Sequence, residues 1–150
     1  MKPGEIITKR RKELGIELQE VADRAGISVA AYRGLESFDD LVEGCTVKTY
    51  IDVCRVLGLH VLDPFQTAIP EIVPMELSEF YQAIREHIKS QSIAAEKFTE
   101  NSGWDPYYLL NLEETSSFID SVPLMAIQDV CRIVGLDWRS VLLGLSGGGA

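Results

Sequence analysis

Apolar residues recur at helical spacing along most of the chain. Leu18, Val21 and Ala22, for example, fall on one face of a short helix. The pattern predicts a first group of helices over residues 6–14, 17–25, 29–36 and 47–57, and a second group over residues 79–89, 93–101, 106–113, 122–134 and 138–143. The predicted fold class is therefore all-α.

The residues between the second and third predicted helices indicate a helix-turn-helix corner. Gly26 stands where a helix ends in a left-handed backbone, and Ser28 is a good N-cap for the next helix. Only Gly26 and Ile27 separate the two helices, which is typical of this motif. In the second group, Gly103 takes the corner and Asp105 takes the cap.

A sequence repeat with a constant offset of 77 residues relates the two groups of helices. Residues 52–59, DVCRVLGL, return at residues 129–136 as DVCRIVGL. The same alignment, which we call the repeat register, gives twelve identities in sixty positions between residues 7–66 and 84–143. One register held over this length predicts a duplication. The predicted organisation is an N-terminal module at 1–66, a proline-containing linker at 67–77, a C-terminal module at 78–145 and a flexible tail at 146–150.

The N-terminal module carries a set of residues in a characteristic order, namely Arg11, Gly15-Ile16-Glu17, Ala22, Gly26-Ile27-Ser28, Leu35-Glu36 and Leu57-Gly58-Leu59. With this order it resembles the lambda-repressor-like (Cro/repressor, XRE) helix-turn-helix family. The resemblance implies two tandem modules of that type with about five helices each, the second of them divergent. It also implies a structural role for Arg11 and Glu36, which match the family's ion pair between the first and third helices. The C-terminal module has Ile88 in place of that arginine.

The resemblance also implies where DNA would bind. In this family a glutamine begins the second helix, and polar side chains at the start of the third helix reach base edges in the major groove. Here Leu18 replaces the glutamine, and Arg33 is the expected strong donor. The predicted DNA-binding residues are Lys9, Arg10, Lys12, Ser28, Val29, Ala30, Arg33, Thr46 and Lys48. The alternative is that the basic first helix is only a solvated face.

The matching part of the C-terminal module is aromatic instead of basic. It contains Trp104, Tyr107, Tyr108 and Leu110. Aromatic residues are favoured at protein interfaces, so these four are predicted to contact a protein partner or a second copy of the chain. The alternative places Trp104 and Tyr108 in the core and leaves Tyr107 alone outside.

The net charge of the chain and its distribution bear on two hypotheses for the function. The chain has a net charge of −9, of which residues 1–63 carry −2 and residues 64–150 carry −7. An acidic chain is a poor general ligand for a polyanion. The first hypothesis is a DNA-binding transcriptional regulator that contacts duplex DNA through its N-terminal module. The alternative is a non-DNA-binding adaptor or antagonist, which a positive face broken by Glu17, Glu20 and Asp23 would favour.

Other classes of function find no motif in the sequence. A glycine-rich phosphate loop, a metal-ligand cluster and a nucleophile elbow are all missing, so no enzyme, cofactor, metal or small-molecule substrate is predicted. Cys45, Cys54 and Cys131 form no CxxC pair, and the last two are expected to be small buried hydrophobes. The N-terminus does not resemble a signal peptide and no apolar stretch is long enough to span a bilayer, which predicts a cytoplasmic protein without a membrane partner.

Overall fold

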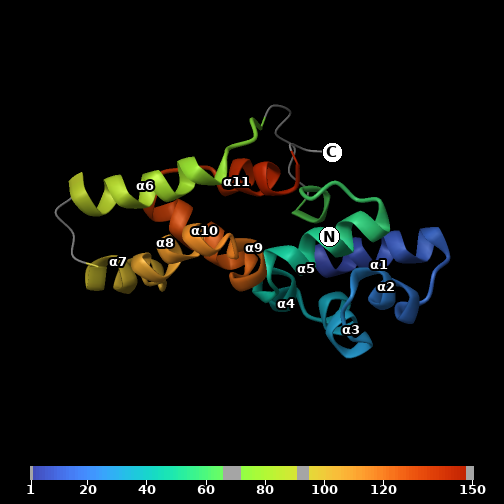
Figure 1. Cartoon of the computed structure of the whole chain (residues 1–150). Helices are drawn as coiled ribbons and strands as arrows, with labels where there is room; N and C mark the ends of the chain where they lie inside the picture. The colour runs from blue at the N-terminus through green and yellow to red at the C-terminus, as the bar shows by residue number, and fades with distance from the viewer. Residues whose placement is uncertain (1, 66–71, 91–94, 148–150) are drawn as a thin grey trace.

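The computed structural model describes residues 2–65, 72–90 and 95–147. Over these residues the chain forms helices without a named β-strand, so the all-α prediction is confirmed (Figure 1). The N-terminal half contains α1 (Pro3–Leu14), α2 (Leu18–Ala25), α3 (Val29–Ser37), α4 (Asp39–Gly44), α5 (Val47–Leu57) and the 3-10 helix η1 (Asp63–Phe65). The C-terminal half contains α6 (Leu77–Ser90), α7 (Ala95–Ser102), α8 (Pro106–Thr115), α9 (Phe118–Ser121), α10 (Leu124–Val134) and α11 (Trp138–Leu145).

The sequence pattern misses the shortest of these elements. The helices α4, η1 and α9 have six, three and four residues, which is too short for a helical period to show. Helix α1 also begins three residues before its predicted start at Ile6, because Pro3 fits the first turn of a helix. The chain therefore has more helical segments than the sequence pattern predicts.

Helices of the two halves stand at equivalent sequence positions. The repeat register takes α2 onto α7 and α5 onto α10 at both ends. Side chains at equivalent positions are buried in both halves. Ile7 and Ile84 are one such pair, and Cys54 and Cys131 are another. The packing also repeats, since α2 contacts α3 and α5 in one half, and α7 contacts α8 and α10 in the other.

An ion pair joins the first and third helices of each half, but its arginine comes from a different turn. In the first half the Arg11 guanidinium binds Glu36 through two hydrogen bonds, Nε–Oε2 at 2.6 Å and Nη2–Oε1 at 3.1 Å. In the second half Arg85 binds Glu113. Arg85 lies one helical turn before Ile88, the residue equivalent to Arg11. An ion pair thus joins α6 and α8 although the position equivalent to Arg11 holds no arginine.

The two halves meet where α5 and α10 begin. Thr46 and Pro123 form an isolated antiparallel bridge. The N–H of Val47 donates to the carbonyl of Val122 (2.9 Å), and the N–H of Leu124 donates to the carbonyl of Cys45 (3.1 Å). The repeat register exchanges these two bonds, and α5 packs on α9 as α10 packs on α4. The junction is therefore related to itself by an approximate two-fold axis, like the interface of a symmetric dimer.

A second contact between the halves involves the C-terminal helix. The ring of Phe65, the last residue of η1, meets the Trp138 ring of α11 edge-on, with the centroids 5.1 Å apart. Of the predicted linker, residues 67–71 lie outside the described residues. Farther along it, the N–H of Met75 donates to the carbonyl of Ser140 at 2.9 Å. Over the described ranges, no helix combines the length and the apolar character needed to cross a membrane.

Candidate interaction surface

The helix-turn-helix corner of the first half is built as its residues predict. Gly26 has φ +73°, and the N–H of Ile27 donates to the carbonyl of Ala22 at 3.0 Å. Ser28 caps α3, because its Oγ accepts a hydrogen bond from the N–H of Ala31 at 3.0 Å. The start of α3 is therefore held rigidly at the surface.

The exposed start of α3 offers little for base recognition. Ser28, Ala30 and Arg33 are exposed, whereas Val29 is half-buried against the core. Ser28 already uses its hydroxyl as the helix cap. Arg33 makes no ion pair within the described part of the chain, so it is the one long cationic side chain that α3 presents.

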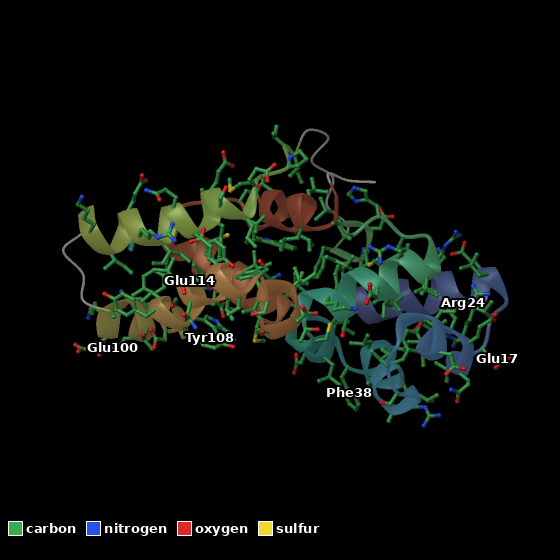
Figure 2. The ribbon with its side chains drawn as sticks, viewed as in Figure 1. Glu17, Arg24, Phe38, Glu100, Tyr108 and Glu114 are labelled. Carbon is green, nitrogen blue, oxygen red and sulfur yellow. The ribbon has the colours of Figure 1, made fainter. Side chains whose placement is uncertain are left out.

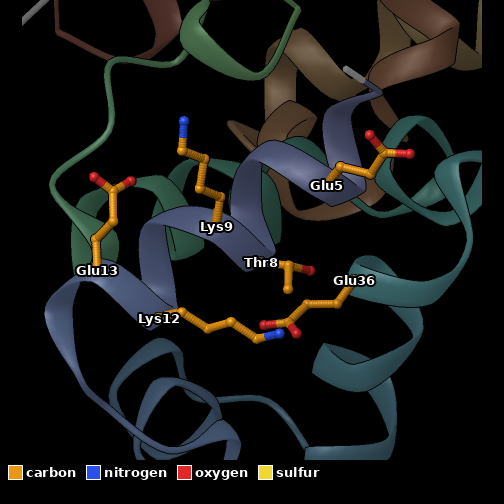
Figure 3. Close-up of a pocket in the computed structure, with 6 residues that line it drawn as sticks. All are labelled: Glu5, Thr8, Lys9, Lys12, Glu13 and Glu36. Atoms are coloured by element: carbon orange, nitrogen blue, oxygen red, sulfur yellow. The ribbon is translucent and has the colours of Figure 1, made fainter.

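The basic residues of α1 have separate environments. Arg10 is half-buried, and its Nε donates to the carbonyl of Leu57 at the end of α5 (2.8 Å). Lys9 and Lys12 are exposed. These two lysines line a hollow together with Thr8, Glu5, Glu13 and Glu36 (Figure 3). Figure 3 shows the Lys12 and Glu36 side chains reaching toward each other, so carboxylates offset the positive charge of this face.

Two other predicted DNA-binding residues lie at the junction between the halves. Thr46 caps α5 by accepting from the N–H of Thr49 at 3.2 Å, and its backbone forms the bridge to Pro123. Lys48 is exposed and pairs with Asp52 at 2.8 Å, and this hydrogen bond raises the pKa of Lys48. The nine predicted residues therefore do not form one basic surface.

The corner of the second half presents two aromatic side chains. Gly103 has φ +84°, and Asp105 caps α8 by accepting from the N–H of Tyr107 at 2.9 Å. Tyr107 and Tyr108 are both exposed at the start of this helix. They take the positions equivalent to Ala30 and Ala31 of the first half. The two tyrosines are thus available for contacts, as the interface hypothesis requires.

The other two residues predicted for this interface serve the core. Trp104 is half-buried, and its indole Nε1 donates to Asp129 at 3.3 Å. Leu110 is also half-buried and packs against the core. The alternative that placed Tyr108 in the core does not match its exposure.

Besides Leu14 and Val73, three exposed apolar residues were not predicted from the sequence. Phe38 and Leu41 lie at the two ends of the turn that begins α4, and Met125 lies in the first turn of α10. The repeat holds a signal for two of them, since Phe38 aligns with Thr115 and Met125 aligns with Lys48, which are polar. Leu41 gives no such signal because its equivalent, Phe118, is apolar and buried.

These residues and the two tyrosines occupy the helices around the junction. We call them the junction face, which comprises Phe38, Leu41, Tyr107, Tyr108 and Met125, with exposed fractions between 36% and 64%. Helix α4 packs on α10, while α8 packs on α9 and α9 packs on α5. In Figure 2 the labelled Phe38 and Tyr108 project from the two halves toward the same lower edge of the molecule.

Acidic residues surround the junction face. The chain has no Lys or Arg between Lys97 and Arg132, and it has six Asp or Glu in that interval. Asp40, Glu114 and Asp120 are exposed. Glu17, the N-cap residue of α2, and Asp23 on α2 are exposed as well. Exposed carboxylates therefore lie near the junction face and near α3, beside the exposed cations Arg33 and Lys48.

Cys54 and Cys131 are buried and Cys45 is half-buried, which lowers the reactivity of their thiols. Burial raises the pKa of Cys45 to about 11 and that of Cys54 and Cys131 to about 12. At neutral pH these cysteines are protonated and are poor nucleophiles. Among residues 2–65, 72–90 and 95–147, no group of three or more His, Cys, Asp or Glu is placed to hold a metal ion.

Comparisons with known proteins do not identify the chain. No family model matches it, and neither a curated protein nor a solved structure shows significant similarity to it. The resemblance to the lambda-repressor-like family stays a prediction that rests on the residues of this sequence.

Proposed function

We propose that the chain is a protein-interaction module of the adaptor or antagonist type, built on two helix-turn-helix units that no longer read DNA. One observation carries the proposal: of the seven large apolar side chains exposed in the described residues, the five of the junction face lie on or beside helices that pack around the junction between the halves. Grouped exposed apolar residues mark protein-binding sites more often than isolated ones do. Tyrosine, present here as Tyr107 and Tyr108, is among the residue types that most often anchor such sites.

Electrostatics supports the same function. Phosphate contacts require Lys or Arg, and each one contributes to a salt-dependent affinity. Within the described residues Arg33 on α3 is exposed without an ion pair and Lys48 at the junction pairs with Asp52, against exposed carboxylates at Asp40, Glu114 and Asp120. A phosphate backbone approaching this face would be repelled by the carboxylates, whereas a protein surface of opposite charge would be attracted.

Photo-crosslinking in cells tests the proposal. A benzophenone amino acid is placed at Leu41 or Tyr108, and in a control at exposed Glu13 on α1. We expect a protein adduct from the first two positions and none from the control. The partner is then purified, and Tyr107→Ala/Tyr108→Ala should weaken its binding by about tenfold or more, while Glu13→Ala leaves it unchanged. Equal binding by both variants would contradict the proposal.

A DNA-binding regulator is the second candidate. It is favoured by the exposure of Arg33, Lys9 and Lys12 on the first half. Binding to random duplex DNA at about 50 mM salt, where phosphate contacts are strongest, separates the two candidates. If the chain is an interaction module, we expect no binding to duplex DNA at this salt concentration. Binding that falls steeply with salt and is lost in Arg33→Glu would replace our proposal with DNA recognition.

A further inference from the structure

The chemistry of the junction face also specifies its partner. We infer that the occupant is a Lys- or Arg-rich segment of another protein that carries apolar side chains between its basic ones. The inference rests on the proposed function and adds the chemical class of the ligand to it. Three properties of the face support it: its apolar side chains, the carboxylates around them and the exposed tyrosine rings.

The apolar part of the face calls for apolar anchors on the partner. Leu41 reaches across α3, where its Cδ1 lies 2.7 Å from the position that a Cβ on Gly34 would occupy. It therefore lies flat on the helix and presents its other side to solvent. Met125 has an unbranched and adaptable side chain that can fit varied partners. Phe38 is the most exposed member of the face. Covering these three side chains removes apolar surface from water.

The surrounding charges require a basic partner. The carboxylates of Glu36 and Glu113 are already bound by Arg11 and Arg85. The carboxylates of Asp40, Glu114 and Asp120, in contrast, form no hydrogen bond or ion pair within the described ranges, although the charge of Asp120 acts on the exposed Lys48. Each can therefore accept a charged hydrogen bond from a lysine or arginine of a partner. An anionic membrane is disfavoured by the same charges, since basic segments are what bind such membranes.

The tyrosines add a preference for cations. Tyr107 and Tyr108 are adjacent on α8, so their rings point in different directions from the helix axis. Their hydroxyls are engaged in no hydrogen bond over the described part of the chain. A guanidinium or ammonium group can stack on such a ring, while a second cation of the partner pairs with a carboxylate farther along α8. Glu114 follows Tyr107 by seven residues, two helical turns along the same side of α8.

A matched pair of peptides tests the inference with the full-length chain. One is an amphipathic peptide of about 18 residues made of Leu and Arg, and the other has Glu in place of every Arg. Calorimetry should detect binding of the Arg peptide alone, with an affinity that falls as salt is raised. Tyr107→Ser/Tyr108→Ser should weaken it by about tenfold, and Tyr107→Phe/Tyr108→Phe should retain most of it.

The repeat provides the control. Ala30→Ser/Ala31→Ser changes the equivalent positions of the first half and should leave binding unchanged. Glu114→Gln/Asp120→Asn removes charge without shortening a side chain, and it should also lower affinity for the Arg peptide. This second variant keeps the test informative if the tyrosine variant loses its helical circular dichroism.

The outcomes separate the inference from the function on which it rests. Equal binding of the two peptides, or binding that all variants retain, would overturn the inference. If crosslinking still captures a partner at Leu41 and Tyr108, the interaction module stands and its ligand has another chemistry. If both experiments fail, the module proposal falls as well. Binding of the chain to anionic vesicles in preference to the Arg peptide would assign the face to a membrane instead.

Discussion

The two halves of this chain share a helical frame and differ in what they place upon it. Helices α2 and α7 occupy equivalent positions, as do α5 and α10, and equivalent side chains fill both cores. At the start of α3, however, the first half has Ala30 and Ala31. At the equivalent positions of α8 the second half has Tyr107 and Tyr108. The two cores are therefore similar, whereas the surfaces at the starts of these helices differ.

The largest expected difference in stability between the halves concerns the ion pairs that join their first and third helices. The Arg11 and Glu36 side chains are only 13% and 9% exposed, while those of Arg85 and Glu113 are 42% and 35% exposed. Arg11→Ala leaves a desolvated carboxylate without its partner and should lower the free energy of unfolding by about 3 kcal/mol. Arg85→Ala removes a solvated pair and should cost less than about 1 kcal/mol. Urea unfolding measures both, and equal losses would show that burial does not separate the two pairs.

Close packing of glycine gives the next largest expected difference. A Cβ on Gly144 would lie 1.8 Å from the Met75 carbonyl oxygen, whereas a Cβ on Gly34 would meet only the end of the Leu41 side chain. Gly144→Ala must displace backbone and should cost about 2 kcal/mol, because overpacking strains a rigid contact. Gly34→Ala lets Leu41 move and should be close to neutral. Thermal unfolding of both variants tests this order, which a larger loss for Gly34→Ala would reverse.

Acid sensitivity should show the smallest difference. Burial acts to raise the pKa of Glu36, but its hydrogen bonds and the charge of Arg11 outweigh burial and hold the pKa below its usual value of 4.5. A lowered pKa stabilises the fold above that value, and the stability is lost as pH falls through the folded-state pKa. Between about pH 5 and pH 3, Glu36→Gln should therefore lose stability less steeply than the wild type.

Asp137 provides the control for acid sensitivity in the second half. The hydrogen bond from Arg139 lowers the pKa of Asp137, and this pair is more exposed than the Arg11–Glu36 pair. Asp137→Asn should change the slope with pH less than Glu36→Gln does, because solvent screens the exposed pair. A greater change for Asp137→Asn would mean that the second half controls the acid response.

The helical frame could be predicted because it depends on short-range signals. Gly26 and Gly103 end their helices with a positive φ, and Ser28 and Asp105 cap the helices that follow. The surface could be predicted only in part. The environments of Arg10 and Thr46 depend on partners that are remote in the sequence, at Leu57 and Pro123. Local periodicity carries no information about such distant contacts.

The two halves that meet at the antiparallel bridge carry different side chains, so the two ends of the junction are not equivalent. A homodimer with the same junction would show identical chemistry on either side of its two-fold axis, so a partner lying across it could bind equally well in either orientation. Here Phe38 and Leu41 come from one half of the chain, and the tyrosines and Met125 come from the other. A segment that spans the junction meets a different surface at each of its ends, so its N-to-C orientation is specified by the chain itself.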